Sequence, residues 1–297
     1  MMTERRVLIV GANGNTGSSA IDHLLRREVK VRAFVQTNDE RASRLRSRGV
    51  EVTVGDVRSI GDVRAALTGI GATYFIYPIQ PGLIDATAYF AQAAREAGVS
   101  AIVNMSQISA RAEAKSHAAL NHWISERIFD WSGIPMTHLR PTFFANWLTY
   151  QHFAQYVSRD KVIAFPFERA RHAPIAAEDL GRFIAALLAD PAPYAGKIYP
   201  LRGPIEMNHD EIANDIGEVL GFEVHYVPLE IDEFRLRLER DLQFPSFMVQ
   251  HLCEVALDYR NGIFGGTDDI IERVTGEAPM TVQAFISHHK DAFSRPD

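Results

Sequence analysis

Three glycines near the start of the chain carry the strongest chemical signal in the sequence. Gly11, Gly14 and Gly17 follow the apolar run at residues 7–10 and precede a segment with apolar residues at helical spacing. Such glycines permit a sharp turn off a strand, a close approach of the backbone to a phosphate, and tight packing of helix on strand. The helix N-terminus then offers free N–H groups to an anion. The pattern predicts a dinucleotide-binding loop, and an ordinary strand–turn–helix without a ligand is the alternative.

Composition narrows the classes of function. The chain has 297 residues, 46% of them hydrophobic, which is enough for one large domain or for a main domain with a smaller lobe. Its formal net charge of −6 gives no basic field for nucleic acid. No apolar run approaches the roughly 20 residues of a membrane span, and no signal peptide precedes the first strand. We therefore expect a cytoplasmic protein with no nucleic-acid or membrane partner.

Metal and disulfide chemistry are not expected. Cys253 is the single cysteine, so an intramolecular disulfide and a cysteine-rich metal site are excluded. It lies in an apolar-periodic segment, which favours a buried structural role over a nucleophile. The sequence has neither an HExxH motif nor a cluster of carboxylates and histidines, and it predicts no metal site.

The first half of the chain alternates between strands and helices that would position the glycine loop. After the strand at residues 7–10, apolar runs predict strands at residues 29–35, 51–54, 72–77, 101–105 and 135–140. Helical spacing predicts helices at residues 62–67, 84–97 and 117–131. Repeated strand–helix units with right-handed crossovers predict an α/β fold with a doubly wound parallel sheet covered on both faces.

The rhythm changes after Pro141, where aromatic residues gather. We expect residues 1–142 to form the dinucleotide-binding domain. Residues 143–297 should form mainly a smaller C-terminal α/β substrate lobe, with segments such as 197–201 returning to the sheet. Phe143, Phe144 and Trp147 belong to the aromatic cluster. Core packing and an apolar substrate pocket are equally good interpretations of it, because both use the same residue types.

Motifs along nearly the whole chain resemble one known family. Besides the loop at residues 11–17, they lie at residues 54–56, 132–137, 139–144, 172–180 and 278–281. Together they resemble the NmrA-like branch of the atypical short-chain dehydrogenase/reductase superfamily, whose members have a Rossmann fold that binds NAD(P). The branch includes quinone and alkene reductases, isoflavone-reductase-like enzymes and proteins that bind the cofactor as redox sensors.

The resemblance implies cofactor contacts at several strand ends. Asp56 would meet the adenine amino group, with the Val57 backbone nearby, although a turn or helix cap also explains an aspartate there. The loop of Pro78, Ile79 and Gln80 would pass along the nicotinamide ribose and pyrophosphate. Further cofactor contacts are implied for Asn13, Asn15, Thr16, Gln36, Ser106, His122, Pro141 and Thr142.

The choice between the two nicotinamide cofactors depends on the end of the second strand. An acid there would bind the ribose hydroxyls of NAD, and an arginine would favour the 2′-phosphate of NADP. Gln36 occupies the position where this branch usually has the arginine, and Asp39 lies farther along. Arg41 and Arg44 could reach a phosphate from the next helix, or could simply be solvated. The absence of an acid at the strand end slightly favours NADP(H) over NAD(H).

The expected catalytic pair of the superfamily is missing. Typical members use a Tyr-x-x-x-Lys pair on the helix after the fifth strand, with a serine at the strand end. Ser106 is retained, but the tyrosine position falls on Ala118 and the lysine position on His122. His122 is the candidate catalytic residue, because an imidazole can donate a proton near neutral pH. It could instead position the cofactor or fill space.

Two hypotheses remain from the sequence. The first is an NAD(P)H-dependent oxidoreductase that transfers hydride to a small apolar acceptor, quinone- or enone-like, held by Phe143, Phe144 and Trp147. A conjugated acceptor can take its proton from solvent, so the missing tyrosine is tolerable. The second is a non-catalytic redox sensor that binds NAD(P) and a protein partner. Enzymes dominate the superfamily, and we therefore place the reductase first.

Overall fold

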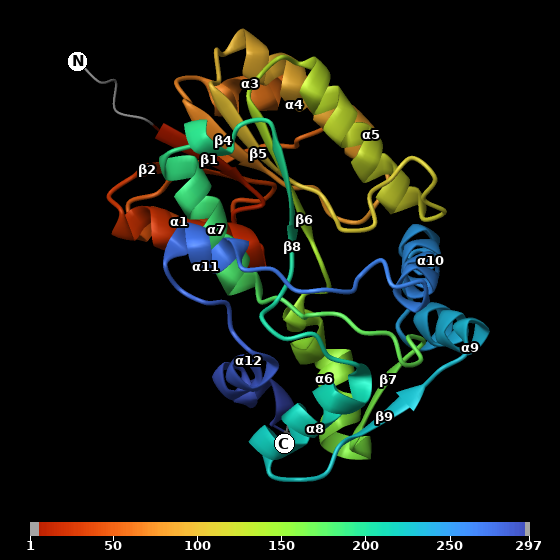
Figure 1. Cartoon of the computed structure of the whole chain (residues 1–297). Helices are drawn as coiled ribbons and strands as arrows, with labels where there is room; N and C mark the ends of the chain where they lie inside the picture. The colour runs from red at the N-terminus through yellow and green to blue at the C-terminus, as the bar shows by residue number, and fades with distance from the viewer. Residues whose placement is uncertain (1–5, 295–297) are drawn as a thin grey trace. The chain divides into compact units, whose positions relative to one another are not determined.

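The larger sheet of the computed structural model, which describes residues 6–294, has seven strands in the order β3-β2-β1-β4-β5-β6-β8 (Figure 1). The five pairings from β3 to β6 are all parallel. The strands are β1 (Arg6–Val10), β2 (Lys30–Val35), β3 (Glu51–Val54), β4 (Ala72–Phe75), β5 (Ala101–Met105), β6 (Met136–Pro141) and β8 (Lys197–Leu201).

The central strands are buried on both faces, as a doubly wound sheet requires. Every residue of β4 and of β5 is buried. Helices α3 (Ile60–Leu67), α4 (Leu83–Glu96) and α5 (His117–Trp131) cover one face of the sheet (Figure 1). Helices α1 (Asn15–Arg26) and α7 (Ala177–Ala189) cover the other. The predicted α/β fold with a doubly wound parallel sheet is confirmed.

The chain divides into two compact units. The first unit comprises residues 1–112, 120–140 and 180–199, and the second comprises residues 113–119, 141–179 and 200–297. The first unit thus contains the glycine loop and most of the sheet. Its apolar core includes Phe75, Phe90 and Phe129, whose rings meet at centroid distances of 4.9 to 6.4 Å.

The second unit has its own core and a small parallel sheet, in which β7 (Val162–Phe165) pairs with β9 (His225–Pro228). Its core includes Ile212, Ile216 and Phe285. Its helical segments, some of them single turns, are η1 (Ala145–Thr149), α6 (Gln151–Asp160), α8 (His209–Leu220), α9 (Ile231–Leu236), η3 (Arg237–Asp241), α10 (Ser246–Arg260), α11 (Ile270–Thr275), α12 (Val282–His288) and η4 (Lys290–Phe293).

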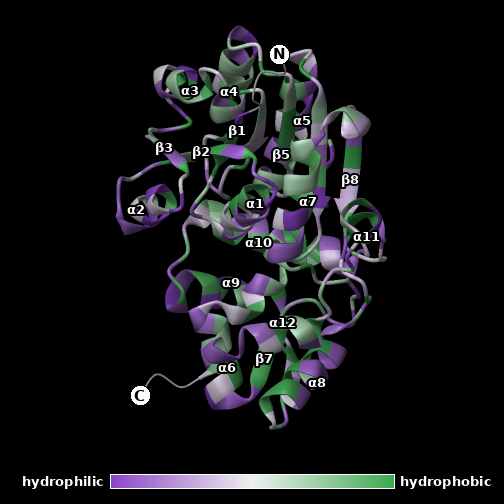
Figure 2. Ribbon diagram, turned by 90° about the vertical axis from the view of Figure 1, so that its left-hand side faces the viewer, coloured by the Kyte–Doolittle hydropathy of each residue, from purple (hydrophilic) through white to green (hydrophobic). Residues whose placement is uncertain are grey.

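Several element boundaries differ from the sequence prediction. The strand expected at residues 72–77 ends at Phe75, and the Tyr77 hydroxyl beyond it donates to the carbonyl of Pro81 at 2.9 Å. The helix expected to carry Arg41 and Arg44 is α2 (Glu40–Ser47), and a short turn, η2 (Ala192–Tyr194), precedes β8. Colouring by hydropathy shows α2 as mostly hydrophilic and β5 as mostly hydrophobic (Figure 2).

Two expectations from composition concern the single cysteine and membrane-spanning segments. Cys253 is buried in α10, and burial raises the pKa of its thiol, so the structural role predicted for it fits its position. Between residues 6 and 294, every helix is too short or too polar to cross a membrane.

Candidate functional site

The glycine loop between β1 and α1 has the geometry that its sequence predicts. Gly11 has a φ of +66°, a conformation that side chains disfavour, and a Cβ there would meet Ile76 Cγ2 at 2.6 Å. A Cβ on Gly17 would lie 2.3 Å from the Gly11 carbonyl oxygen, so helix and strand can approach this closely only at glycine. The Gly14 N–H donates to the same oxygen at 2.9 Å and closes the turn.

The N-terminus of α1 lacks the side-chain cap that α2 and α3, the next two helices of the first unit, have. Its N-cap is Gly14, no described side chain accepts from its first N–H groups, and its first turn holds no acid. Asp39 and Ser59 cap α2 and α3 with their side-chain oxygens. The positive end of the α1 dipole and its N–H groups therefore remain available to an external anion.

The remaining loop residues differ in exposure. Asn15 is exposed and Asn13 is half-buried. Thr16 is buried, and its hydroxyl lies 2.9 Å from the hydroxyl of Tyr74 on β4. Thr16 therefore links the loop to the sheet through its side chain, and its main-chain N–H belongs to the uncapped first turn.

The end of β2 is polar and exposed. Gln36 is exposed directly after the strand. Asp39 receives the main-chain N–H groups of Arg41 and Ala42 and two bonds from the Arg41 guanidinium, at 2.9 and 2.7 Å. These bonds lower the pKa of Asp39 to about 2. The nearest acid is thus engaged as a helix cap, and it holds Arg41 beside the strand end.

The other arginines near β2 and β3 have separate partners. Arg32 points away from the loop edge and donates to the carbonyls of Ala66 and Thr68 at the C-terminus of α3. Arg44 is exposed and lies 3.7 Å from Glu40. Of Arg32, Arg41 and Arg44, only Arg41 therefore bonds to a residue of the turn between β2 and α2.

Asp56 follows β3 and is paired with an arginine that sequence reasoning missed. Arg58 donates to it from its main chain at 2.8 Å and from Nη2 at 2.9 Å. Hydrogen bonds from Arg58 lower the pKa of Asp56, so its carboxylate stays ionised and still has lone pairs for a further donor. Val57 packs partly buried against the core of the first unit.

The loop after β4 lies beside the glycine loop, because Ile76 contacts the position of Gly11. Pro78 and Gln80 are exposed, and Ile79 is half-buried. The Gln80 side-chain nitrogen lies 3.4 Å from the Tyr77 hydroxyl. The first unit thus brings the ends of β1 and β4 together, as expected for a dinucleotide site at the carboxyl ends of parallel strands.

A buried charged cluster at the end of β5 is the main feature that the sequence did not reveal. Glu126 on α5 is fully buried. Its Oε1 accepts from Ser106 Oγ at 2.6 Å and from Arg140 Nε at 2.8 Å. Its Oε2 accepts from Arg140 Nη2 at 2.5 Å. Glu126 lies four residues after His122, a spacing that could have linked the two in the sequence.

The positions of the missing catalytic pair lie on the same helix. Ala118 and His122 are both buried, with exposed fractions of 3% and 4%. His122 and Glu126 are one turn apart and share a face of α5, and Glu126 in turn binds Ser106. The structure therefore places Ser106, His122 and Glu126 in one region of the first unit.

The predicted substrate residues belong to the second unit. Phe143 and Trp147 are half-buried, with ring centroids 6.2 Å apart, and Phe144 is half-buried beside Ile175. Pro141 is the last residue of β6, and the Thr142 N–H donates to the Leu201 carbonyl at 2.9 Å. Phe143 also packs against Tyr259 and several other rings, so part of this aromatic cluster is core.

A second buried polar group lies inside that aromatic core. His172, His209 and Tyr259 are at most 1% exposed, and within residues 6–294 no protein atom hydrogen-bonds to their side chains. The centroids of the two imidazoles are 5.0 Å apart, as are those of His172 and Tyr259. Burial lowers the pKa of His209 to about 3 and that of His172 well below its ordinary value.

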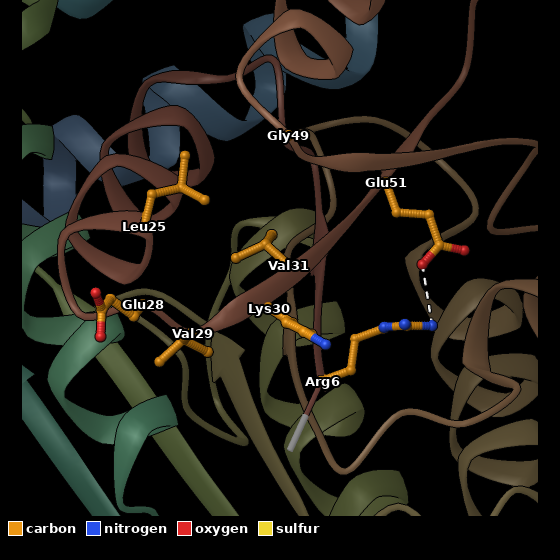
Figure 3. A pocket seen from close by; sticks show the side chains of 8 residues that line it. All are labelled: Arg6, Leu25, Glu28, Val29, Lys30, Val31, Gly49 and Glu51. Atoms are coloured by element: carbon orange, nitrogen blue, oxygen red, sulfur yellow. Dashed lines mark ion pairs between the residues drawn. The ribbon is translucent and has the colours of Figure 1, made fainter. Parts of the chain in front are cut away.

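One pocket lies away from all of these residues. It is lined by residues at the amino-terminal ends of β1 and β2, including Arg6 and Lys30, and by Glu51, which pairs with Arg6 at 3.1 Å (Figure 3). The glycine loop is at the opposite ends of these strands. In the part of the chain that the structure describes, no three His, Cys, Asp or Glu side chains are grouped to hold a metal ion.

Comparisons with known proteins agree with this architecture. Residues 3–286 match the model of the NmrA-like family. An NAD(P)H azoreductase from Xenophilus azovorans is 26% identical over 290 residues, covering 97% of this chain and 99% of the azoreductase.

Two solved structures with bound cofactor share the fold. The NADPH-dependent quinone oxidoreductase QOR2 from Escherichia coli, complexed with NADPH, is 22% identical with a TM-score of 0.85, covering 95% of this chain and 99% of QOR2. The Citrobacter sp. triphenylmethane reductase, complexed with NADP(H), is 23% identical with a TM-score of 0.82, covering 97% of this chain and 99% of the reductase. At such identities the likeness establishes the fold.

Proposed function

Because the chain belongs to the NmrA-like family, we propose that it is an NAD(P)H-dependent reductase of a small apolar acceptor with a conjugated or carbonyl system, such as a quinone or an enone. The NAD(P)H reductases among its relatives support the cofactor class and the reaction type. Bound NAD(P)H would supply the hydride, and the residues of this chain would bind and orient it.

The uncapped N-terminus of α1 is the observation that carries the proposal. A pyrophosphate fits there, because Gly14 leaves the first N–H groups without a side-chain acceptor and Gly11 and Gly17 leave no space-filling Cβ. Asp56 is the proposed acceptor for the adenine amino group, with Val57, and Pro78, Ile79 and Gln80 are proposed to contact the nicotinamide half.

The pairing of Asp39 with Arg41 favours NADP(H). An acid that is already bonded to a guanidinium and capping α2 is a poor acceptor for ribose hydroxyls. The Arg41 side chain, held by Asp39 in the turn after β2 and more than half exposed, offers a cation to a 2′-phosphate. We therefore expect tighter binding of NADPH than of NADH.

The absence of the Tyr–Lys pair fits a conjugated acceptor. Hydride addition to a quinone or enone gives a delocalised anion that can take its proton from water, so Ala118 at the tyrosine position is tolerated. His122 is proposed to orient the cofactor or to donate that proton. In the second unit, Phe143, Phe144 and Trp147 are proposed to contact the apolar substrate.

Titration with NADPH, followed by acceptor-dependent oxidation of NADPH with quinones, enones and azo dyes, tests the reductase. We expect turnover with at least one acceptor class, and no binding or turnover in Gly17→Ala, whose Cβ cannot fit. Tight binding without turnover across the panel would overturn the reductase and leave the sensor that discriminates NADP⁺ from NADPH.

Cofactor preference is tested with a matched pair of arginine variants. Arg41→Ala should weaken NADPH binding by about tenfold or more, since a charge-assisted bond contributes about 1.5–3 kcal/mol, and should not weaken NADH binding. Arg44→Ala is the control on the same helix and should change neither affinity. Equal losses for NADPH and NADH in Arg41→Ala would contradict recognition of the 2′-phosphate.

A further inference from the structure

The Ser106 hydroxyl donates to a fully buried carboxylate, that of Glu126. Glu126 is fully buried, and its Oε1 receives both Ser106 Oγ at 2.6 Å and Arg140 Nε at 2.8 Å. Arg140 also binds Oε2, which fixes the plane of the carboxylate. The serine therefore faces an acceptor whose position is set by two parallel bonds from one guanidinium.

This arrangement determines what Ser106 can offer to a ligand. An ionised carboxylate can only accept hydrogen bonds, and a serine hydroxyl has one proton. That proton is committed to Glu126, so only the lone pairs of Ser106 Oγ remain for another partner. Ser106 cannot polarise a substrate carbonyl by donation while Glu126 holds its proton.

We propose that Ser106 is a hydrogen-bond acceptor for the carboxamide NH₂ of the nicotinamide ring, and that Glu126 and Arg140 are the positioning residues that make it so. The inference rests on the proposed function, since it assumes that NAD(P)H binds. Ser106 directly follows β5, at the carboxyl ends of the strands where cofactors of this fold bind. A carboxamide nitrogen can only donate, so its N–H matches a serine that can only accept.

The 3-acetylpyridine analogue of NADPH tests this assignment, because it replaces the carboxamide NH₂ with a methyl group. Dissociation constants for NADPH and for the analogue are measured by fluorescence titration without any acceptor present. Wild type should prefer NADPH about fivefold, the worth of one hydrogen bond. Ser106→Ala should bind both ligands equally.

Ser100→Ala provides the matched control. Ser100 immediately precedes β5, at the other end of the same strand, and bonds the Gly71 carbonyl at 2.8 Å. This variant should keep the preference for NADPH. A wild type without preference, or a Ser106→Ala variant that retains it, would overturn the role of Ser106.

The positioning role of Glu126 is tested with Glu126→Gln, whose amide replaces one acceptor oxygen with a donor. The variant protein is first shown to be folded by circular dichroism. Its preference for NADPH should fall, because the Ser106 hydroxyl no longer has to donate to residue 126 and is no longer restricted to accepting. Full wild-type preference in folded Glu126→Gln would overturn this role. Failure of the wild-type protein to bind NADPH at all would instead contradict the proposed function, so the two failures are distinguishable.

Discussion

Two clusters of buried polar side chains, one in each unit, are accommodated in opposite ways in an apolar interior. In the first unit, both oxygens of Glu126 are bonded, and its charge is matched by Arg140. In the second unit, His172 and His209 have no hydrogen-bond partner among the described residues. Burial lowers both of their pKa values, so they are neutral at pH 7.

The difference shows what each interior can tolerate. A buried charge must be paired, because the desolvation of an isolated charge costs on the order of several kcal/mol. A buried histidine can lose its proton instead, and the remaining cost is then that of the hydrogen bonds that its ring nitrogens do not make. The first cluster should therefore be sensitive to loss of a partner, and the second to a gain of protons.

The largest effect should come from breaking the charged cluster. Glu126→Leu leaves the Arg140 guanidinium without its carboxylate and should lower the free energy of unfolding by about 3–5 kcal/mol, measured by urea denaturation. Glu96→Leu is the control, because Glu96 pairs with Arg64 on the surface, where solvent screens the pair, and its loss should cost far less. Equal costs would contradict the distinction between buried and surface pairs.

Acid should act on the second cluster. The folded pKa of His209, about 3, lies below its unfolded value near 6.5, so the unfolded state binds more protons between these values. Stability is thus full above pH 6.5 and falls as the pH drops through this window, by about 2 kcal/mol at pH 5. His209→Phe should remove much of that loss in pH-dependent denaturation.

His225 supplies the control for this experiment. It lies on β9 with 61% of its side chain exposed, so His225→Phe replaces a histidine outside the buried cluster and should not reproduce the effect of His209→Phe. If His209→Phe and wild type lose stability equally between pH 6.5 and 5, protonation of the buried cluster is not what acid acts on.

The smallest effect is a contrast between two tyrosines. Tyr74 is fully buried and its hydroxyl lies 2.9 Å from that of Thr16, so Tyr74→Phe should cost about 1 kcal/mol. Tyr259 is equally buried but its hydroxyl has no partner among residues 6–294, so Tyr259→Phe should be neutral or stabilising. Similar costs at both positions, by thermal denaturation, would mean that Tyr259 is hydrogen-bonded after all.

The sequence determined those features that depend on neighbouring residues. Three elements, β3, β5 and α5, have the bounds predicted for them at residues 51–54, 101–105 and 117–131. The periods of strands and helices can be recognised in the pattern of neighbouring side chains. The glycine loop could also be predicted, since the need for glycine arises from the positive φ of Gly11 and from the contact between Gly17 and Gly11, although Ile76 also crowds Gly11.

Only the tertiary structure decided which polar groups are buried and what they bind. Ser106 and Arg140 lie 20 and 14 residues from Glu126 in the chain, and helical charge patterning alone suggests a solvated residue there. The same holds for His172 and His209, whose pKa values depend on aromatic rings brought from distant segments. Local propensity follows from adjacent residues, whereas desolvation and hydrogen-bond partners depend on packing between remote ones.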